Sequence, residues 1–183
     1  AAPGRIFAER RKRGGLLRDI DLMHIVHVVG RSKNGKTTLI VELVKEMTRR
    51  GLKVGSLKHS GHEHELDRPG KDSYRHREAG AVPAAITTPS QMAVFLPAVP
   101  GENPFDRLGP LFGDCDIVLV EGYVTGPGTK VEVWRAATGK DPFFKERPEI
   151  QAVITDDPVE TALPVLPLSN VPAVVDFLLD LGE

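Results

Sequence analysis

The sequence predicts an α/β fold, a three-layer sandwich with a mostly parallel sheet and an antiparallel β insertion. Short apolar runs rich in β-branched residues alternate with helical patterns along most of the chain, which is typical of parallel strands joined by helices. A glycine-rich turn joins the first apolar run to the first helical pattern. Two later runs, separated only by Pro89 and Ser90, predict an antiparallel pair inside this alternation.

The first three elements form a strand–helix–strand unit. Residues 23–29, MHIVHVV, have the β-branched content of a buried strand. The helix expected at 35–50 carries Leu39, Leu43 and Met47 at four-residue spacing, and Gly51 is suited to end it. Residues 52–59 follow as a second strand. Two strands connected in this way are parallel, and the crossover between them is right-handed.

The remaining elements follow a polar loop, residues 59–71. Strands are expected at 84–88, 91–96, 115–122, 130–135, 150–155 and 163–168, and helices at 72–79, 104–112 and 170–183. Asn170 is the expected N-cap of the last helix. Residues 130–135, KVEVWR, alternate as a half-exposed strand does, and with the loop before them they look suited to pairing with another subunit.

Composition limits the class of protein. The 183 residues are 40% hydrophobic and 27% charged with a net charge of −1, which is ordinary for a globular domain and argues against nucleic acid as an obligatory partner. A single cysteine, Cys115, and the lack of a long apolar stretch favour a cytoplasmic protein without a membrane span. We expect residues 1–22 to be a basic, flexible extension (a solvated tail, or alternatively a docking arm) and residues 23–183 to be one domain.

Residues 30–37, GRSKNGKT, match the phosphate-binding motif Gly-x-x-x-x-Gly-Lys-[Ser/Thr] at every fixed position. Its glycines allow the main chain to approach phosphate closely, and the helix that follows presents its positive end to the anion. We expect Lys36 to reach the β- and γ-phosphates and Thr37 to complete the shell of a Mg²⁺ ion. Because the motif lies between a strand and a helix, it predicts a three-layer P-loop NTPase sandwich. The cofactor-binding residues expected in it are Gly30, Ser32, Lys33, Asn34, Gly35, Lys36, Thr37 and Thr38.

An acidic residue at the end of a neighbouring strand is also required to hold the metal. Glu121 ends the apolar run DIVLVE, whereas Asp116 begins it and therefore lies at the opposite edge. The loop after the second strand holds His59, His62 and His64, but the basic residues beside them favour a phosphate- and pterin-facing loop over a zinc site.

At this point the sequence resembles the molybdopterin-guanine dinucleotide biosynthesis adaptor protein B family, often called MobB. The matching pieces, in order, are VVGRSKNGKTTL, KHSGHEHELDRPGKDSYRHREAG, DIVLVEGY, KVEVWR and AVITDD. The resemblance implies a dimeric, metabolic P-loop GTPase with weak Mg²⁺-dependent hydrolysis, so at most a slow enzyme. It also implies a guanylyltransferase partner, which attaches GMP to molybdopterin, other molybdoenzyme maturation factors, and molybdopterin itself as a further ligand.

Carried onto this sequence, the resemblance implies roles for individual residues. Asp67 and Asp72 become catalytic candidates that position water, with Asp67 also a metal candidate; Glu121 is the strand-end acid; Lys58 and His59 belong to the wall of the site. Arg31 and Lys33 depart from the family by adding positive charge to the loop, with either nucleotide or a dimer partner as the possible contact.

The base-reading and catalytic groups are less defined by the sequence. No Asn-Lys-x-Asp motif is present, so Asp156 in the segment 155–157 is the expected acceptor for guanine, while a turn cap before Pro158 explains it equally well. Arg31, Arg68 or Arg75 could act across a dimer, and without such help hydrolysis should be slow.

The sequence is also compatible with two other functions, and it leaves one possible dimer interface undecided. A small-molecule kinase or ligase would use the same P-loop, and a GTPase metallochaperone would use the His-rich loop. Val133 and Trp134, beside Phe143 and Phe144, could form a dimer patch or could cover the monomer's own sheet.

Overall fold

The computed structural model describes residues 23–182, and its chain divides into two compact units. The first comprises the described residues up to Ser60 together with those from Arg107 onward, and the second comprises Gly61–Asp106. The predictions for residues 1–22 fall outside the described part of the chain.

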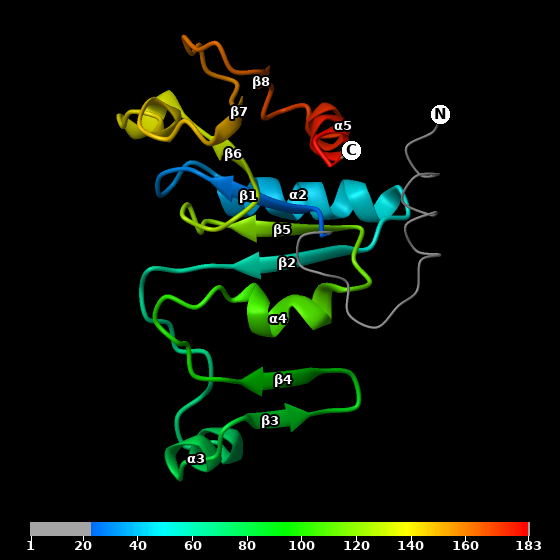
Figure 1. Ribbon diagram of the computed structural model, residues 1–183, viewed down its shortest axis with the longest axis vertical. Coiled ribbons are helices and arrows are strands. Elements are labelled where there is room, and N and C mark those ends of the chain that lie inside the picture. Colours follow the sequence, from blue (N-terminus) through cyan, green and yellow to red (C-terminus); the bar gives the residue numbers. More distant parts are fainter. Residues whose placement is uncertain (1–22, 183) are drawn as a thin grey trace. The chain divides into compact units, whose positions relative to one another are not determined.

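The first unit is built on a parallel sheet (Figure 1). Its strands are β1 (Ile25–Val29), β2 (Val54–Lys58), β5 (Ile117–Glu121), β6 (Thr129–Val133), β7 (Ile150–Ile154) and β8 (Val165–Leu166), in the spatial order β2-β5-β1-β6-β7-β8. Every neighbouring pair is parallel. β5 lies between β2 and β1, the two strands of the first strand–helix–strand unit, and its last residue, Glu121, is in register with Lys58 at the end of β2.

Helices α2 (Lys36–Arg49) and α5 (Val171–Asp180) lie side by side and pack on one face of this sheet (Figure 1). Leu39, Leu43 and Met47 are buried there as their spacing predicts, and Gly51 follows the helix with φ +84°. Core side chains from both helices and four strands (β1, β5, β6 and β7) form one cluster, in which Val26, Val28 and Leu43 are completely buried.

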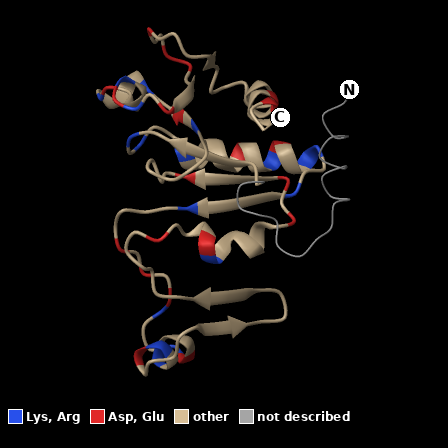
Figure 2. Ribbon diagram, viewed as in Figure 1, with Lys and Arg blue, Asp and Glu red and all other residues tan. Residues whose placement is uncertain are grey.

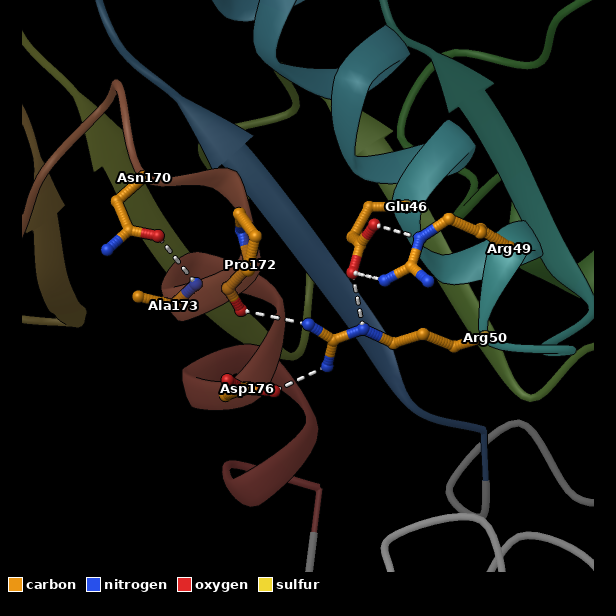
Figure 3. Close-up of polar contacts among 7 residues, drawn as sticks. All are labelled: Glu46, Arg49, Arg50, Asn170, Pro172, Ala173 and Asp176. Atoms are coloured by element: carbon orange, nitrogen blue, oxygen red, sulfur yellow. Dashed lines mark hydrogen bonds and ion pairs between the residues drawn. The ribbon is translucent and has the colours of Figure 1, made fainter.

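Arg50 links the two helices at the end of α2 (Figure 3). Its guanidinium pairs with Asp176 of α5, donates to the Pro172 carbonyl at 3.3 Å and donates to Glu46 at 2.8 Å. Glu46 also accepts two hydrogen bonds from Arg49. At the start of α5 the Asn170 side chain accepts a hydrogen bond from the Ala173 amide at 3.3 Å, so the predicted N-cap is confirmed. (Pro172 and Ala173 belong to the first turn.)

The opposite face of the sheet is covered in part by loops. The His27 ring lies against the loop that follows β5, where its Nε2 lies 2.7 Å from the Pro127 carbonyl oxygen. Glu132 on β6 meets the turn Phe143–Lys145, because the amides of Phe143 and Phe144 donate to its carboxylate at 2.6 and 2.9 Å. Another 3₁₀ turn, Ala136–Thr138, follows β6.

The prediction for residues 130–135 was wrong in one respect. β6 is not half-exposed, and neither of its edges is open to a strand of another subunit. It pairs with β1 on one side and with β7 on the other. Val131, Glu132 and Val133 have no exposed surface. Val133 thus covers the monomer's own sheet, and the predicted apolar patch loses it. The alternation of apolar and charged residues wrongly predicted a face in water, because the charged residue Glu132 is buried and its carboxylate accepts hydrogen bonds from main-chain amides.

The second unit holds α3 (Asp72–Glu78) and an antiparallel pair, β3 (Ala84–Thr87) and β4 (Met92–Phe95). The predicted antiparallel insertion is therefore confirmed, as is the α/β fold with a mostly parallel sheet. The boundary between the units falls within α4 (Phe105–Phe112). Within residues 23–182, no helix is both long and apolar enough to cross a membrane.

Candidate functional site

The candidate site lies at the edge of the sheet where the parallel strands end. The groups brought to this edge are Lys58 after β2, Glu121 after β5, the loop 30–35 after β1, Arg135 after β6, and Thr155–Asp157 after β7. Their order along the edge follows the strand order, so the glycine-rich loop has Glu121 on one side and Arg135 on the other. Ligands of open parallel sheets bind at this carboxyl edge.

The glycine-rich loop is fastened to the end of β6. An ideal Cβ at Gly30 would lie 2.3 Å from the Val133 carbonyl oxygen, and Gly30 has φ +138°, so only glycine fits there. Asn34 is completely buried and its Nδ2 donates to the same Val133 carbonyl at 3.0 Å. These two contacts hold both halves of the loop against one carbonyl group.

Arg31 is engaged within the chain. Its Nε donates to the Asp141 carbonyl at 2.9 Å, its guanidinium carbon lies 4.5 Å from the centre of the Phe143 ring, and its Nη2 lies 3.4 Å from Glu146. The turn that supplies these partners is itself held by Glu132, whose pKa is raised because burial disfavours its charged form. The extra charge of Arg31 therefore anchors the loop to residues 141–146.

The first turn of α2 is arranged to receive an anion. Gly35 is its N-cap with φ +91°, no side chain of residues 23–182 caps it by a hydrogen bond, and no acidic residue lies in the first turn. The Lys36 ammonium group donates to the carbonyls of Gly30 and Arg31, each at 2.9 Å. Burial lowers the pKa of Lys36, partly offset by the nearby charge of Glu121. Main-chain amides, the positive end of the helix and a lysine together fit the phosphates of a nucleotide.

The side chains of Thr37, on α2, and Glu121, at the end of β5, meet beside this turn. The Thr37 hydroxyl donates to Glu121 Oε1 at 2.8 Å, and the same oxygen lies 3.5 Å from the Lys58 ammonium group. Figure 2 shows the basic end of β2 next to the acidic end of β5, where Lys58 is in register with Glu121. Hydroxyl and carboxylate oxygens are the ligands that Mg²⁺ prefers, so this pair fits a magnesium ion. The other loop residues named from the sequence, Ser32, Lys33 and Thr38, are exposed.

His59 takes part in a stack of rings that the sequence analysis did not foresee. Its ring lies parallel to that of Tyr123, with centroids 4.5 Å apart, and the edge of Tyr123 faces His27 at 5.7 Å. Tyr123 has φ +56° and lies two residues beyond Glu121, so the stack sets the path of the chain immediately after the acidic residue. Gly126 is required beside it, since a Cβ there would lie 2.5 Å from the Tyr123 ring. Burial lowers the pKa of His27.

Asp156 and its neighbour both hold loops. Asp156 Oδ1 accepts hydrogen bonds from the amide and the hydroxyl of Ser169, at 3.0 and 2.9 Å, and these bonds lower its pKa. Asp157 Oδ2 accepts from the Ala136 amide at 2.9 Å. The turn-capping explanation thus has geometric support, and base recognition by Asp156 stays a prediction.

Asp67 and Asp72 belong to the second unit. Asp67 accepts a hydrogen bond from the Ser73 hydroxyl at 3.2 Å and lies 3.5 Å from Arg77 Nε. Asp72 is exposed in the first turn of α3. Their roles at the nucleotide stay predictions. No group of three or more His, Cys, Asp and Glu side chains is gathered as a metal ion would need anywhere in residues 23–182.

The sequence and the fold of this chain are similar to those of known proteins. The family model of molybdopterin guanine dinucleotide synthesis protein B (MobB) matches residues 25–156, which is most of the chain. The chain belongs to the MobB family. The family match runs from the first strand to Asp156, so it includes the loop 30–35, Glu121 and the first two residues after β7.

Individual MobB proteins agree with this assignment. The molybdopterin-guanine dinucleotide biosynthesis adapter protein of Haemophilus influenzae is 31% identical over 156 residues, covering 84% of this chain and 86% of the relative. The protein of the same name from Escherichia coli is 31% identical over 157 residues, covering 81% and 87%. Among solved structures, the crystal structure of Bacillus subtilis MobB superposes with a TM-score of 0.66 at 27% identity, covering 86% of this chain and 96% of that one.

Proposed function

We propose that this chain is a GTP-binding adapter in molybdopterin-guanine dinucleotide biosynthesis, which assists the guanylyltransferase that attaches GMP to molybdopterin. The family assignment and the adapter names of its relatives support the pathway. One observation supports nucleotide binding most directly. Lys36 and Thr37 begin α2 beside Glu121 at the end of β5, and no side chain of residues 23–182 caps the start of this helix by a hydrogen bond.

Each group has a defined task in this proposal. The amides of residues 30–37 bind phosphate oxygens, and Lys36 exchanges its two carbonyl partners for the β- and γ-phosphates. Thr37 and Glu121 would hold Mg²⁺, which neutralises phosphate charge when bound. Lys58, whose ammonium group lies 3.5 Å from Glu121 Oε1, orients the Glu121 carboxylate. Asp156 is the proposed acceptor for guanine, and molybdopterin is a further proposed ligand of the adapter.

Hydrolysis is expected to be slow. The groups at the phosphate cradle bind charge, and binding alone does not orient an attacking water molecule. Asp67 and Asp72 are the residues that we propose for that task. We therefore expect the pure protein to hold GTP for many minutes and to act through its bound state, in the cytoplasm, together with molybdoenzyme maturation factors.

A homodimer is part of the proposal. Exposed large apolar side chains are concentrated in the second unit, where Met92 is 72% and Val94 is 52% exposed on the same face of β4. A face of this kind favours burial against a second copy. Sedimentation velocity should give a dimer for the wild type and a monomer for Met92→Lys; a wild-type monomer at about 10 µM would remove this part of the proposal.

The test of the function is nucleotide binding followed by partner capture. Isothermal titration with GTP and ATP in Mg²⁺ should show preference for GTP, and Lys36→Ala should weaken binding by about 100-fold or more. Lys45→Ala is the matched control, because Lys45 lies on the same helix and pairs only with exposed Glu42. Recombinant guanylyltransferase should be retained by the GTP-loaded chain. Equal affinity for ATP and GTP, or normal binding by Lys36→Ala, would contradict the proposal.

A further inference from the structure

Arg135 lies beside the phosphate cradle although the sequence motif does not include it. It follows β6 by two residues, and its guanidinium packs against Gly35, the residue that begins α2. An ideal Cβ on Gly35 would lie 3.4 Å from Arg135 Nη2, 3.5 Å from Nε and 3.6 Å from Cζ. The guanidinium of Arg135 therefore lies within van der Waals distance of Gly35, beside the main chain of the cradle.

The backbone holds Arg135 at this place from both sides. Its own conformation is extended, with φ −139° and ψ 127°, as the 3₁₀ turn Ala136–Thr138 begins. The Ala136 amide donates to Asp157 at 2.9 Å, and the Thr138 hydroxyl donates to the Arg135 carbonyl at 2.9 Å. The position is thus fixed by the chain before any ligand binds, which reduces the entropy that ligand binding would cost.

The charge of Arg135 has no fixed partner in the described chain. Its side chain is exposed, and the guanidinium makes no hydrogen bond or ion pair with any other residue of 23–182. The positive end of α2 is next to it, with Lys36 in the same turn and no acidic residue there. A cation at a helix N-terminus is unfavourable by itself, so this arrangement calls for an anion. The pKa of Asp156 is lowered mainly by its hydrogen bonds from Ser169, and the nearby charge of Arg135 adds to this effect.

We propose that Arg135 binds the α-phosphate of the nucleotide, between the glycine-rich loop and the base-proximal segment 155–157. This inference rests on the proposed function, because it takes a guanine nucleotide as the ligand of the edge. Strand order supports the α-phosphate. Glu121 and Thr37, the proposed metal ligands of the terminal phosphates, lie on the β5 side of β1, whereas Arg135 lies on the β6 side, next to β7. A guanidinium also presents paired N–H donors that match phosphate oxygens.

The test compares GTP and GDP. Both carry an α-phosphate, so Arg135→Ala should raise the Kd for both by the same factor, roughly ten-fold or more. Arg49→Ala is the matched control: it removes the same charge from an exposed arginine at the far end of α2, about 20 Å away, and should leave both Kd values unchanged. Arg135→Gln keeps the stem and removes the charge, and it should show the same loss, so the comparison stands even if Arg135→Ala unfolds.

The outcomes separate this inference from the proposed function. If the wild type binds neither nucleotide, the proposed function fails. If the wild type binds both, Lys36→Ala binds weakly and Arg135→Ala binds normally, only the role of Arg135 is refuted. A loss confined to GTP would also refute it, since it would place Arg135 at the terminal phosphate. Equal loss for both nucleotides, with a thermal midpoint within about 1 °C of wild type, is the expected result.

Discussion

Replacing Gly30 with alanine tests how the phosphate cradle is attached to the sheet. The new Cβ would lie 2.3 Å from the Val133 carbonyl oxygen, while carbon–oxygen contacts need about 3.3 Å, so the ends of β1 and β6 would have to part by about 1 Å. Gly30 also has φ +138°, a conformation that residues with a side chain rarely adopt.

The magnitude follows from these two effects. Forcing an extra carbon into a packed position costs about 1–3 kcal/mol, and the unfavourable backbone costs about 1–3 kcal/mol more. The sum, about 2–6 kcal/mol, is a large part of the stability of an ordinary domain. At about 2–4 °C per kcal/mol for a chain of this size, the midpoint of thermal unfolding should fall by roughly 4–20 °C.

Gly51→Ala is the matched control, because the substitution is identical and the surroundings differ. Gly51 has φ +84°, but apart from its chain neighbours no atom of residues 23–182 lies within 4 Å of its ideal Cβ, so only the backbone effect remains, about 1 kcal/mol. Differential scanning calorimetry of both variants of the full chain isolates the contact with β6, and a GTP titration reports on the cradle. If Gly30→Ala melts within 1 °C of Gly51→Ala and binds GTP normally, the loop is not packed on β6 as described.

Three further predictions concern the helix pair, the sheet interior and the metal. Arg50→Ala removes the link to Asp176 and should lower the free energy of unfolding in urea by about 1–2 kcal/mol, since the side chain is partly buried. Burial lowers the pKa of His27 from about 6.5, so the folded protein binds fewer protons than the unfolded chain just below pH 6.5. The stability that neutral His27 contributes is present above pH 6.5 and lost as the pH falls, so the thermal midpoint should drop between pH 7.5 and 5.5. Thr37→Ala should abolish most of the increase in GTP affinity that Mg²⁺ produces over EDTA.

Each of these has a control. For Arg50→Ala the control is Lys45→Ala, which breaks only an exposed ion pair and should change the free energy of unfolding by less than about 0.5 kcal/mol. If Arg50→Ala changes the free energy of unfolding no more than this control does, Arg50 does not link the two helices. His27→Gln should flatten the pH dependence, and an unchanged profile would assign it to other groups. Thr48 is exposed near the far end of α2, so Thr48→Ala should keep the Mg²⁺ effect, and a Thr37 variant that also keeps it would argue against the proposed metal site.

The glycine-rich loop shows how much of the site can be predicted from residues close together in the sequence. Its strand, turn and helix lie within 25 residues, and hydrophobic periodicity with two glycines was sufficient to place them. Glu121 was found because an acid after four apolar residues ends a strand. Arg31 was noticed for its charge, but its partners at residues 141–146 lie more than 100 positions away and could not be read from its surroundings.

Glu132 shows where the same reasoning failed. Alternating apolar and charged residues normally indicate a strand with one face in water. Here the carboxylate is buried and satisfied by two main-chain amides of a later turn, so β6 is a central strand. A pattern cannot distinguish a charge that faces water from one that a distant loop will cover.

The chain's own order of residues therefore determined the secondary structure, the phosphate-binding loop and the family, because each depends on neighbours within a few turns. The tertiary structure alone decided that β5 and β6 flank β1, and thus that Glu121 and Arg135 stand on either side of the loop. Parallel strands find their partners through main-chain hydrogen bonds and shared burial over long separations, and those energies leave no local mark in the sequence.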